Sequence, residues 1–592
     1  MRQFLITIAG VFLGLVLFFI GVPVLLIAWA TAAARPAPIA DRTVLTLDLR
    51  GGLSDQTGLN PLAALSGRSN SVLAIEQTLR AATNDDHIRG LMVRLPEGGL
   101  PPASADELRL AFKRFRATGK PILAYGQGFY ADGSVLSTYE LAVSSGDLWM
   151  QPASSFQVTG YARQDIFFKR FFDKHGVIPD YQQRYQYKTA VNPFLYSDYT
   201  PAHREADLSW MGSVYQTVLA DVAADRGRPV ETLRGLIEAG PYTAETALAR
   251  GLIDHVGQVK EAEAAILAKA GGGAKLTPFD DYAASSPGGA AAGAATIAVI
   301  SLEGDIMTGR GGSSPGPLGG GLTVRSDDVE KAFHGAIDDS DVRAIVFRVS
   351  SPGGSDTASE QILAAVRAAR AAGKPVVVSM GTYAASGGYW ISSQADRIVA
   401  EPTTLTGSIG VFGGKFALGP ALARFGVDMR GDKVGGEWAD AFSPAAPMTA
   451  TQTAAFAGWM DGIYEGFVRR VADGRHLSPA RVREIAKGRV WTGAQAKTLG
   501  LVDQLGGFYD AVDTAKALAG IKGSARLRSF NTETSPLDAV KRLFGASAQG
   551  AHILATLGAL ADTAAVREVS SQASDAVLRA QGATVLAPRL VN

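Results

Sequence analysis

Residues 344–380 read AIVFRVSSPGGSDTASEQILAAVRAARAAGKPVVVSM, and this stretch predicts the fold of the chain. Its opening apolar run is typical of a buried strand, which the turn Ser351-Pro-Gly-Gly354 ends. Thr357 and Glu360 have the spacing of a capping box, so we expect a helix that ends near Gly373. A second apolar run closes the stretch. Strand, helix and strand in this order indicate an α/β fold with a mainly parallel sheet.

The same pattern occurs earlier in the chain, which indicates an internal duplication. Residues 88–95, IRGLMVRL, resemble residues 342–349, VRAIVFRV. Farther on, residues 242–254 resemble residues 491–503. We therefore predict the following segments: an N-terminal transmembrane anchor (1–35), a first domain copy (36–270), an Ala/Gly/Ser-rich linker (271–294), a second copy (295–520) and a C-terminal tail without an assigned role (521–592).

The N-terminal segment predicts a membrane anchor. No charged residue occurs between Arg2 and Arg35, and residues 4–31 are almost wholly apolar. About 20 apolar residues cross a bilayer, whereas the apolar part of a cleaved signal peptide has roughly 7–15. We therefore favour an uncleaved anchor over a signal peptide.

Composition excludes several classes of function for this chain of 592 residues. The 57 Lys and Arg nearly cancel the 56 Asp and Glu, so no overall field attracts nucleic acid. The absence of Cys excludes disulfides, thiolate metal sites and a cysteine nucleophile. The seven His do not cluster, and there is no P-loop, so we expect neither a metal nor another cofactor.

Ser386 is the strongest candidate nucleophile. It lies in Ala384-Ala-Ser-Gly-Gly388, where a strand is expected to give way to a helix. The amide of Gly387 can point at a developing oxyanion, and Gly353 of the preceding turn is the preferred second donor. The alternative interpretations are a helix N-cap for Ser386 and ordinary turns for the glycines.

A serine nucleophile needs a base. No His occurs between His334 and His476, and the G-x-S-x-G motif is absent. A lysine remains as the candidate. Its ordinary pKa is about 10.4, so it must lie in an apolar site that favours the neutral amine.

Three motifs give the chain a specific resemblance to a known family. Residues 351–355 (SPGGS), 384–392 (AASGGYWIS) and 405–413 (LTGSIGVFG) resemble the signal peptide peptidase A family, also called protease IV, in its long two-domain form. The resemblance implies tandem Clp protease/crotonase-like domains of the ββα superhelix type behind one transmembrane helix. It also implies a Ser/Lys dyad that degrades signal peptides. The family further implies a homotetramer in the bacterial inner membrane, with a single span and its catalytic domains in the periplasm.

The same resemblance assigns the remaining site residues. The family's Tyr-Lys-x-Ala-x-x-Pro-Phe segment matches residues 187–194, which makes Lys188 the candidate base. Ser408 is expected to orient the lysine amine. The rival base is Lys433, because single-domain members of the family carry serine and lysine in one domain.

Comparison of the two copies supports Lys188. Leu136 stands where the second copy has Ser386, and Ala439 stands where the first copy has Lys188. Such complementary loss is expected of an active site divided between the copies. The sequence leaves open whether serine and lysine meet within one chain or between chains.

The sequence therefore predicts a membrane-anchored serine endopeptidase. Its expected partners are signal peptides and other extended hydrophobic peptides, the membrane and further copies of the chain, but not nucleic acid. The alternatives are a crotonase-like acyl-CoA enzyme and a catalytically inactive membrane scaffold.

Overall fold

The structure is a computed structural model, and it describes residues 39–56, 70–285, 294–311, 322–531 and 585–586. The predicted transmembrane anchor, residues 1–35, lies outside these ranges. Among the described helices, none combines the length and the apolar character needed to cross a bilayer.

Each sequence repeat builds one sheet. The first sheet contains, in order, β10 (His255–Val256), β6 (Leu148–Met150), β5 (Ile122–Gly126), β4 (Ile88–Arg94), β1 (Thr43–Asp48) and β11 (Lys275–Pro278). The second contains β21 (Val490–Thr492), β19 (Leu405–Gly407), β17 (Val376–Ala385), β15 (Val342–Ser351), β12 (Thr296–Glu303) and β23 (Arg526–Ser529). In addition, β18 (Arg397–Ala400) pairs with β17, and β22 (Gln504–Leu505) pairs with β18.

The strand order confirms the duplication. β1 pairs in parallel with β4 and β11, and β12 pairs in parallel with β15 and β23. β5 and β17 follow as the next parallel neighbours in their sheets. We call these two α/β units the first and second repeat.

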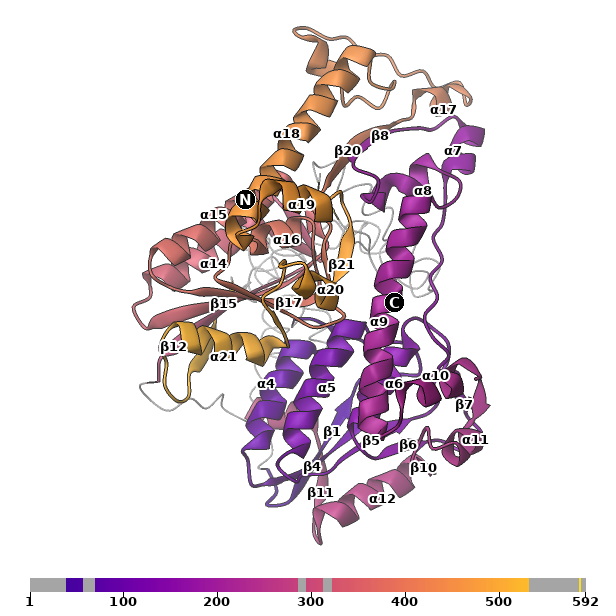
Figure 1. The fold of residues 1–592 in the computed structure, drawn as a ribbon, viewed down its shortest axis with the longest axis vertical. Coiled ribbons are helices and arrows are strands. Elements are labelled where there is room, and N and C mark those ends of the chain that lie inside the picture. Colours follow the sequence, from indigo (N-terminus) through magenta and orange to yellow (C-terminus); the bar gives the residue numbers. More distant parts are fainter. Residues whose placement is uncertain (1–38, 57–69, 286–293, 312–321, 532–584, 587–592) are drawn as a thin grey trace, which may run out of the picture.

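Helices cover both faces of each sheet (Figure 1). Those of the first repeat are α4 (Val72–Thr83), α5 (Pro102–Arg116), α6 (Val135–Ser144), α7 (Lys169–His175), α8 (Asn192–Leu195), α9 (Pro201–Arg226), α10 (Val230–Glu238), α11 (Ala244–Ala249), α12 (Val259–Ala270) and α13 (Phe279–Ser285). Those of the second are α14 (Ser326–Asp338), α15 (Asp356–Ala371), α16 (Gly387–Ser392), α17 (Gly419–Ala423), α18 (Ala450–Arg475), α19 (Pro479–Ile485), α20 (Gly493–Thr498) and α21 (Phe508–Leu518).

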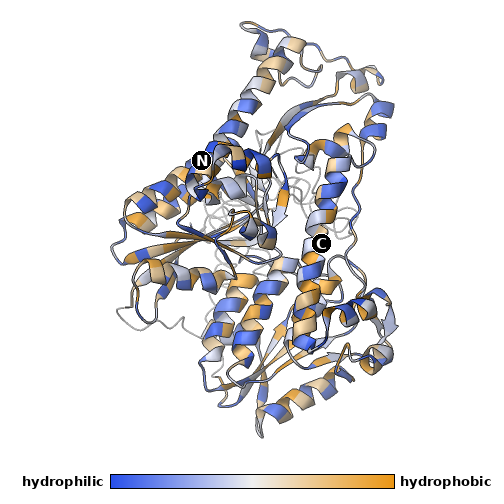
Figure 2. Ribbon diagram, viewed as in Figure 1, coloured by the Kyte–Doolittle hydropathy of each residue, from blue (hydrophilic) through white to orange (hydrophobic). Residues whose placement is uncertain are grey.

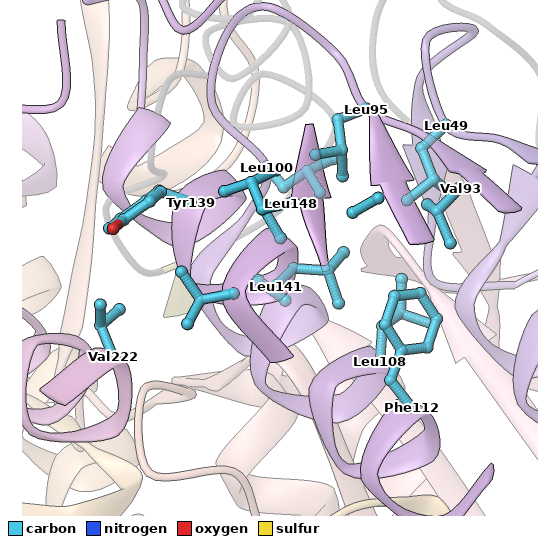
Figure 3. Close-up of a cluster of buried hydrophobic side chains, with 14 of the residues drawn as sticks. Leu49, Val93, Leu95, Leu100, Leu108, Phe112, Tyr139, Leu141, Leu148 and Val222 are labelled. Atoms are coloured by element: carbon cyan, nitrogen blue, oxygen red, sulfur yellow. The ribbon is translucent and has the colours of Figure 1, made fainter. Parts of the chain in front are cut away.

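Alternating side chains of the strands pack on opposite faces. Leu45 belongs to the large core of the first repeat, whereas its neighbour Val44 packs with Ile266 of α12. Figure 3 shows part of the large core, including Leu108 and Phe112 of α5. The helices carry hydrophobic and hydrophilic stripes, as expected for helices with one face on a sheet (Figure 2).

Three local predictions need correction. Residues 275–285 were expected in the linker, but they form β11 and α13. The reason is that β11 pairs in parallel with β1 and forms the edge strand of the first sheet. Residues 526–529 were expected in the tail, but they form β23 at the equivalent edge of the second sheet. The capping box at Thr357 is also wrong, because Ser355 caps α15 by accepting a hydrogen bond from the amide of Ala358.

Several smaller strands surround the two sheets. β13 (Asp305–Met307), β14 (Thr323–Arg325), β16 (Gly353–Gly354) and β24 (Val585–Leu586) form a separate sheet, and the short pairs are β2 (Leu53–Ser54) with β3 (Asn70–Ser71), β7 (Ser155–Phe156) with β9 (Tyr242–Thr243), and β8 (Ile178–Arg184) with β20 (Val411–Ala417). The antiparallel pair β8–β20 joins the two repeats.

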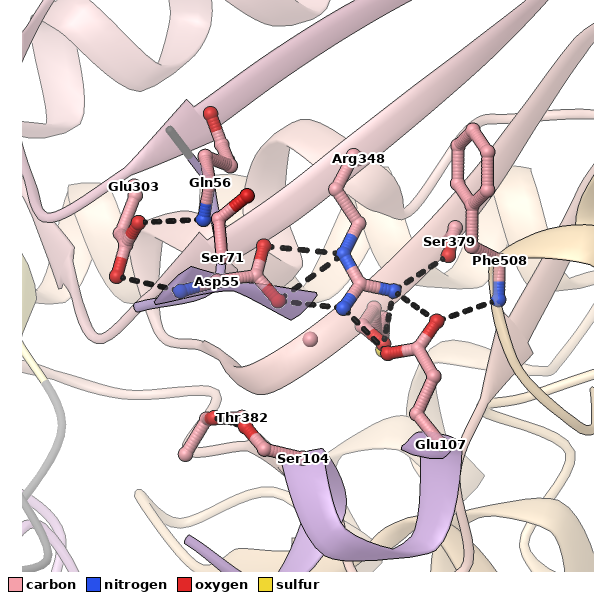
Figure 4. A network of polar contacts seen from close by, with 12 residues as sticks. Asp55, Gln56, Ser71, Ser104, Glu107, Glu303, Arg348, Ser379, Thr382 and Phe508 are labelled. Carbon is pink, nitrogen blue, oxygen red and sulfur yellow. Dashed lines mark hydrogen bonds and ion pairs between the residues drawn. The ribbon is translucent and has the colours of Figure 1, made fainter. Parts of the chain in front are cut away.

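A buried ion-pair network also joins the repeats (Figure 4). Arg348 of β15 donates to the carboxylates of Asp55 and Glu107, both from the first repeat. The Glu107 carboxylate also accepts from the amide of Phe508, at 2.7 Å. Arg348 is 1% exposed, so the network lies in a buried contact between the two repeats. It therefore helps to fix the position of one repeat relative to the other.

Candidate active site

Ser386 lies where β17 ends and α16 begins. Its backbone has φ 57° and ψ −118°, a conformation that non-glycine residues rarely adopt. Such strain persists where the surrounding structure enforces it, often at functional sites. The Ser386 side chain makes no N-cap hydrogen bond to α16, so the expected alternative of a simple helix cap is not what the hydroxyl does.

Lys188 reaches Ser386 from the other repeat. β8 pairs with β20 up to Arg184, and this pairing brings the following segment against the second repeat. The Nζ atom of Lys188 lies 2.7 Å from Ser386 Oγ. It also donates to the carbonyl oxygen and to the Oγ of Ser408, each at 3.0 Å. The structure thus brings together three of the predicted residues within one chain.

The surroundings of Lys188 favour its neutral form. Its side chain is fully buried, and this burial lowers its pKa well below the usual value. Removal of a charged group from water is the cause, because desolvation opposes the ammonium form. A neutral lysine amine carries a lone pair that can accept a proton from a serine hydroxyl.

Ser408 is held in place by the loop that ends with Arg489. Its amide donates to the carbonyl of Arg489 at 2.7 Å, and its hydroxyl donates to the carbonyl of Gly488 at 3.4 Å. Its φ of 50° is a second strained backbone angle beside Lys188. The Ser408 oxygens are therefore fixed acceptors for the lysine amine.

Gly488 is a site residue that the sequence analysis missed. A Cβ at this position would lie 2.5 Å from the Cβ and from the backbone nitrogen of Lys188, and φ is +82°. No side chain fits there, so the glycine permits the close approach of Lys188. Nothing in the sequence near residue 488 indicates a contact with a residue so distant along the chain.

The two predicted oxyanion donors lie on adjacent segments. A Cβ on Gly387 would lie 3.1 Å from the Cα of Gly353 and 3.0 Å from the amide nitrogen of Gly354, so these backbones touch. The Gly353 amide donates to Ser351 Oγ at 3.1 Å. Any other acceptor at the Gly353 amide would therefore have to displace the Ser351 hydroxyl.

The rival base, Lys433, has other partners. Its Nζ lies 3.1 Å from an Asp440 oxygen and 3.6 Å from a Glu437 oxygen, on an exposed segment. The hydrogen bond with Asp440 raises the pKa of Lys433 above its usual value. Lys433 is thus kept charged, the opposite of what a general base requires.

Among the described residues, two groups of carboxylate and imidazole side chains have the spacing of metal ligands. They are Asp165, His203 and Asp207, and Asp106, Glu140 and Asp221. Each group already faces a guanidinium, since Arg163 pairs with Asp165 at 2.7 Å and Arg109 pairs with Asp221 at 2.9 Å. Neither group includes a residue of the Ser386 site.

Comparison with known proteins identifies the family. The model of peptidase family S49 matches residues 114–271 and 368–522, one segment in each repeat. The chain belongs to peptidase family S49. It is a serine peptidase, and the two matched segments agree with the tandem duplication predicted from the sequence.

Similar proteins in other organisms support this assignment. Protease 4 of Salmonella typhi is 36% identical over 84% of this S49 peptidase and 82% of the relative. Protease 4 of Haemophilus influenzae is 32% identical over 88% of this chain and 86% of its own. The chloroplastic serine protease SPPA of Arabidopsis thaliana is 28% identical, over 81% and 69%.

Proposed function

We propose that this S49 peptidase is a membrane-anchored endopeptidase that degrades cleaved signal peptides with a Ser386/Lys188 dyad. The observation that carries the proposal is the 2.7 Å approach of a fully buried lysine amine to Ser386 Oγ. The proposal extends to Ser408 as the residue that orients the amine.

The hydrogen-bond geometry supports a proton-accepting role for Lys188. A neutral amine has two N–H groups and one lone pair. The Ser408 carbonyl can only accept, and the Ser408 hydroxyl is free to accept because it donates to Gly488. With both N–H groups directed at Ser408, the lone pair accepts the hydroxyl proton of Ser386.

The reaction then follows in two stages. Ser386 Oγ attacks the scissile carbonyl carbon while its proton moves to Lys188 Nζ, and the amides of Gly353 and Gly387 stabilise the oxyanion. Lys188 returns the proton to the leaving amine, which breaks the C–N bond and leaves an acyl-enzyme. Water gives up a proton to Lys188, attacks the ester, and releases the acid product as Ser386 regains its proton.

An apolar cluster holds the Lys188 segment against the second repeat. Val191 and Phe194, which follow Lys188, pack with Met307 of β13 and Phe412 of β20. All four side chains are buried, so the cluster fixes the position of Lys188 relative to Ser386. The choice of signal peptides as substrates is supported by the family and by the names of its relatives.

The proposal also places the chain in the bacterial inner membrane, with one span and periplasmic catalytic domains. The apolar residues 4–31 and the family resemblance support that location. A homotetramer is part of the same proposal, and the family resemblance supports it.

Cleavage of a hydrophobic fluorogenic peptide by the detergent-solubilised full chain tests the catalytic proposal. We expect Ser386→Ala and Lys188→Met to lose activity, with Lys433→Met as the matched lysine control. Full activity in Lys188→Met would refute the dyad. Carbonate extraction of membranes, with and without residues 1–35, tests the anchor, and sedimentation of the solubilised chain tests the tetramer.

A further inference from the structure

The loop between α19 and β21, residues 486–489, is bonded to segments of both repeats. Toward the first repeat, the carbonyl of Lys487 accepts a hydrogen bond from the amide of Tyr187 at 3.2 Å. Toward the second repeat, the carbonyl of Arg489 accepts from the amide of Ser408 at 2.7 Å. The backbone of this loop therefore connects the segment that carries the proposed base with the residue that accepts hydrogen bonds from it.

The side chain of Arg489 extends from this loop onto the first repeat. Its two terminal nitrogens donate to the two carboxylate oxygens of Glu205 in α9, each at 2.7 Å. Its guanidinium carbon also lies 4.9 Å from the ring centroid of Tyr187 and 4.4 Å from that of Trp491. A planar guanidinium can combine a two-pronged carboxylate pair with stacking on aromatic rings, whereas a lysine ammonium cannot.

These contacts hold the guanidinium in one orientation. The Arg489 side chain is 14% exposed, although the side chain of Glu205 is 50% exposed. An exposed ion pair contributes little to the free energy of unfolding, because water screens it. A two-pronged pair nevertheless fixes geometry, and the bond from Arg489 lowers the pKa of Glu205, so the carboxylate stays ionised at neutral pH. We therefore expect this contact to matter for orientation more than for stability.

The residue that Arg489 stacks on is the one before the proposed base. Tyr187 is held by the loop twice, through its amide and through its ring. The carbonyl of Arg489 fixes Ser408, whose two oxygens accept from Lys188 Nζ at 3.0 Å. A single residue thus contacts both the segment that carries the lysine and the residue that orients its amine.

We propose that Arg489 is the positioning residue of the Ser386/Lys188 dyad. It clamps the lysine-bearing segment of the first repeat onto the second repeat, and it acts through Tyr187 and Ser408 rather than on the reacting atoms. The inference rests on the proposed function, because it takes Lys188 as the base.

Peptide cleavage by the detergent-solubilised full chain tests the clamp with Arg489→Met. A displacement of the amine by about 1 Å costs about 10²-fold, so we expect kcat to fall by a factor on the order of 10². KM should stay unchanged, because the clamp acts on the lysine and not on the bound peptide. The matched control is Arg483→Met, since Arg483 makes a similar two-pronged pair with Glu465, at 3.1 and 2.6 Å, within the second repeat. Unchanged kcat in Arg489→Met would overturn the inference.

The pH profile separates positioning from a general loss of stability. Burial lowers the pKa of Lys188, so water that reaches a displaced amine should raise it toward about 10.4. The midpoint for labelling of Ser386 by a fluorophosphonate should therefore move to higher pH in Arg489→Met and stay in place in Arg483→Met. A lowered midpoint of thermal unfolding with an unmoved pH profile would make Arg489 a purely structural residue and contradict the proposal.

Conservative variants show which contact of the clamp matters. Arg489→Lys keeps the charge but lacks the planar fork, so its kcat should lie closer to that of Arg489→Met than to wild type. Tyr187→Phe keeps the ring and should retain most activity, whereas Tyr187→Ala should lose activity as Arg489→Met does. Combining Tyr187→Ala with Arg489→Met should add little further loss, because both changes remove one shared contact. Full activity in Arg489→Lys would show that charge alone suffices and would refute the clamp.

Lys188→Met, measured in the same assays, keeps this inference apart from the proposed function. Full activity in Lys188→Met would contradict the proposed dyad itself. An inactive Lys188→Met together with a fully active Arg489→Met would leave the dyad standing and refute only the positioning role. Loss of activity in both, with the pH profile moved only in Arg489→Met among the arginine variants, is the expected result.

Discussion

The two repeats share their supporting contacts and differ in their chemistry. Tyr139 of the first repeat donates to the carbonyl of Leu252 at 2.6 Å, and Tyr389 of the second donates to the carbonyl of Leu501 at 2.8 Å. Each tyrosine is fully buried in its repeat. The duplicated domain has therefore kept the bonds that close its fold.

The proposed catalytic positions have diverged. Leu136 is buried within α6, whereas Ser386 stands just ahead of α16 with its hydroxyl against Lys188. Lys188 is fully buried, whereas its counterpart Ala439 lies on an exposed segment in η3 (Glu437–Asp440). Each repeat thus supplies one half of the proposed dyad. The contacts that both repeats keep belong to the fold, whereas the residues that differ belong to the proposed reaction.

The largest expected effect comes from the nucleophile. Ser386→Ala should lower kcat by a factor on the order of 10⁶, because the covalent pathway is lost. The matched change in the first repeat is Ser134→Ala, since Ser134 makes no cap hydrogen bond to α6. Peptide cleavage measures both. Comparable losses in the two variants would mean that the repeats are not chemically distinct.

Replacement of the proposed base, Lys188, should have the second largest effect on activity. Lys188→Met should lower kcat by about 10²- to 10⁴-fold, the range for positioned acid–base groups. Its midpoint of thermal unfolding should stay the same or rise, because a desolvated amine is replaced by an apolar side chain. Lys433→Met is the control, since that lysine is exposed and paired with Asp440. Activity loss with Lys433→Met alone would reverse the assignment.

The lowered pKa of Lys188 also predicts a pH profile. The neutral amine is the active form, so the rate of Ser386 labelling by a fluorophosphonate should rise with pH through the pKa of Lys188. That rise should occur well below the usual lysine pKa of about 10.4. A labelling rate that falls over this range would contradict a neutral lysine base.

Replacement of Arg348 tests how much the buried ion-pair network between the repeats contributes to stability. Arg348→Met leaves Asp55 and Glu107 buried without their cation, which should cost about 3–5 kcal/mol of unfolding free energy. Burial raises the pKa of Glu107, so the loss should grow as pH rises and that carboxyl must ionise. The control is Arg94→Met, whose arginine holds the equivalent strand position in the first repeat and is partly exposed. Urea denaturation at two pH values measures both, and equal costs would argue against a docking role.

Gly488 should give the smallest effect. Gly488→Ala places a Cβ 2.5 Å from Lys188, and a shift of the amine by about 1 Å costs about 10²-fold in kcat. Gly520→Ala is the control, because Gly520 has a similar φ of +65° and no atom within 4 Å of its Cβ position. Equal activity of the two variants would show that contact between the added Cβ and Lys188 does not affect catalysis, and that any loss comes from backbone strain alone.

Local patterns predicted most of the fold. The main strands, their parallel pairing and the duplication follow from apolar runs that recur in the chain, and the motif around Lys188 identified a residue that the structure places against Ser386. The order of the strands in each sheet was not predicted. Gly488 and the Arg348 network could not be predicted, because their partners lie far away in sequence. β11 escaped prediction because a short edge strand carries few apolar residues.

The meeting of Lys188 and Ser386 across the repeat boundary has a consequence for the chain during its synthesis. The base is translated long before the nucleophile, and it becomes desolvated only when the second repeat encloses it. Until then Lys188 is an ordinary charged side chain with no serine to activate. On the proposed mechanism, a chain that ends before the second repeat cannot form the dyad, so peptide hydrolysis begins only when both domains are complete.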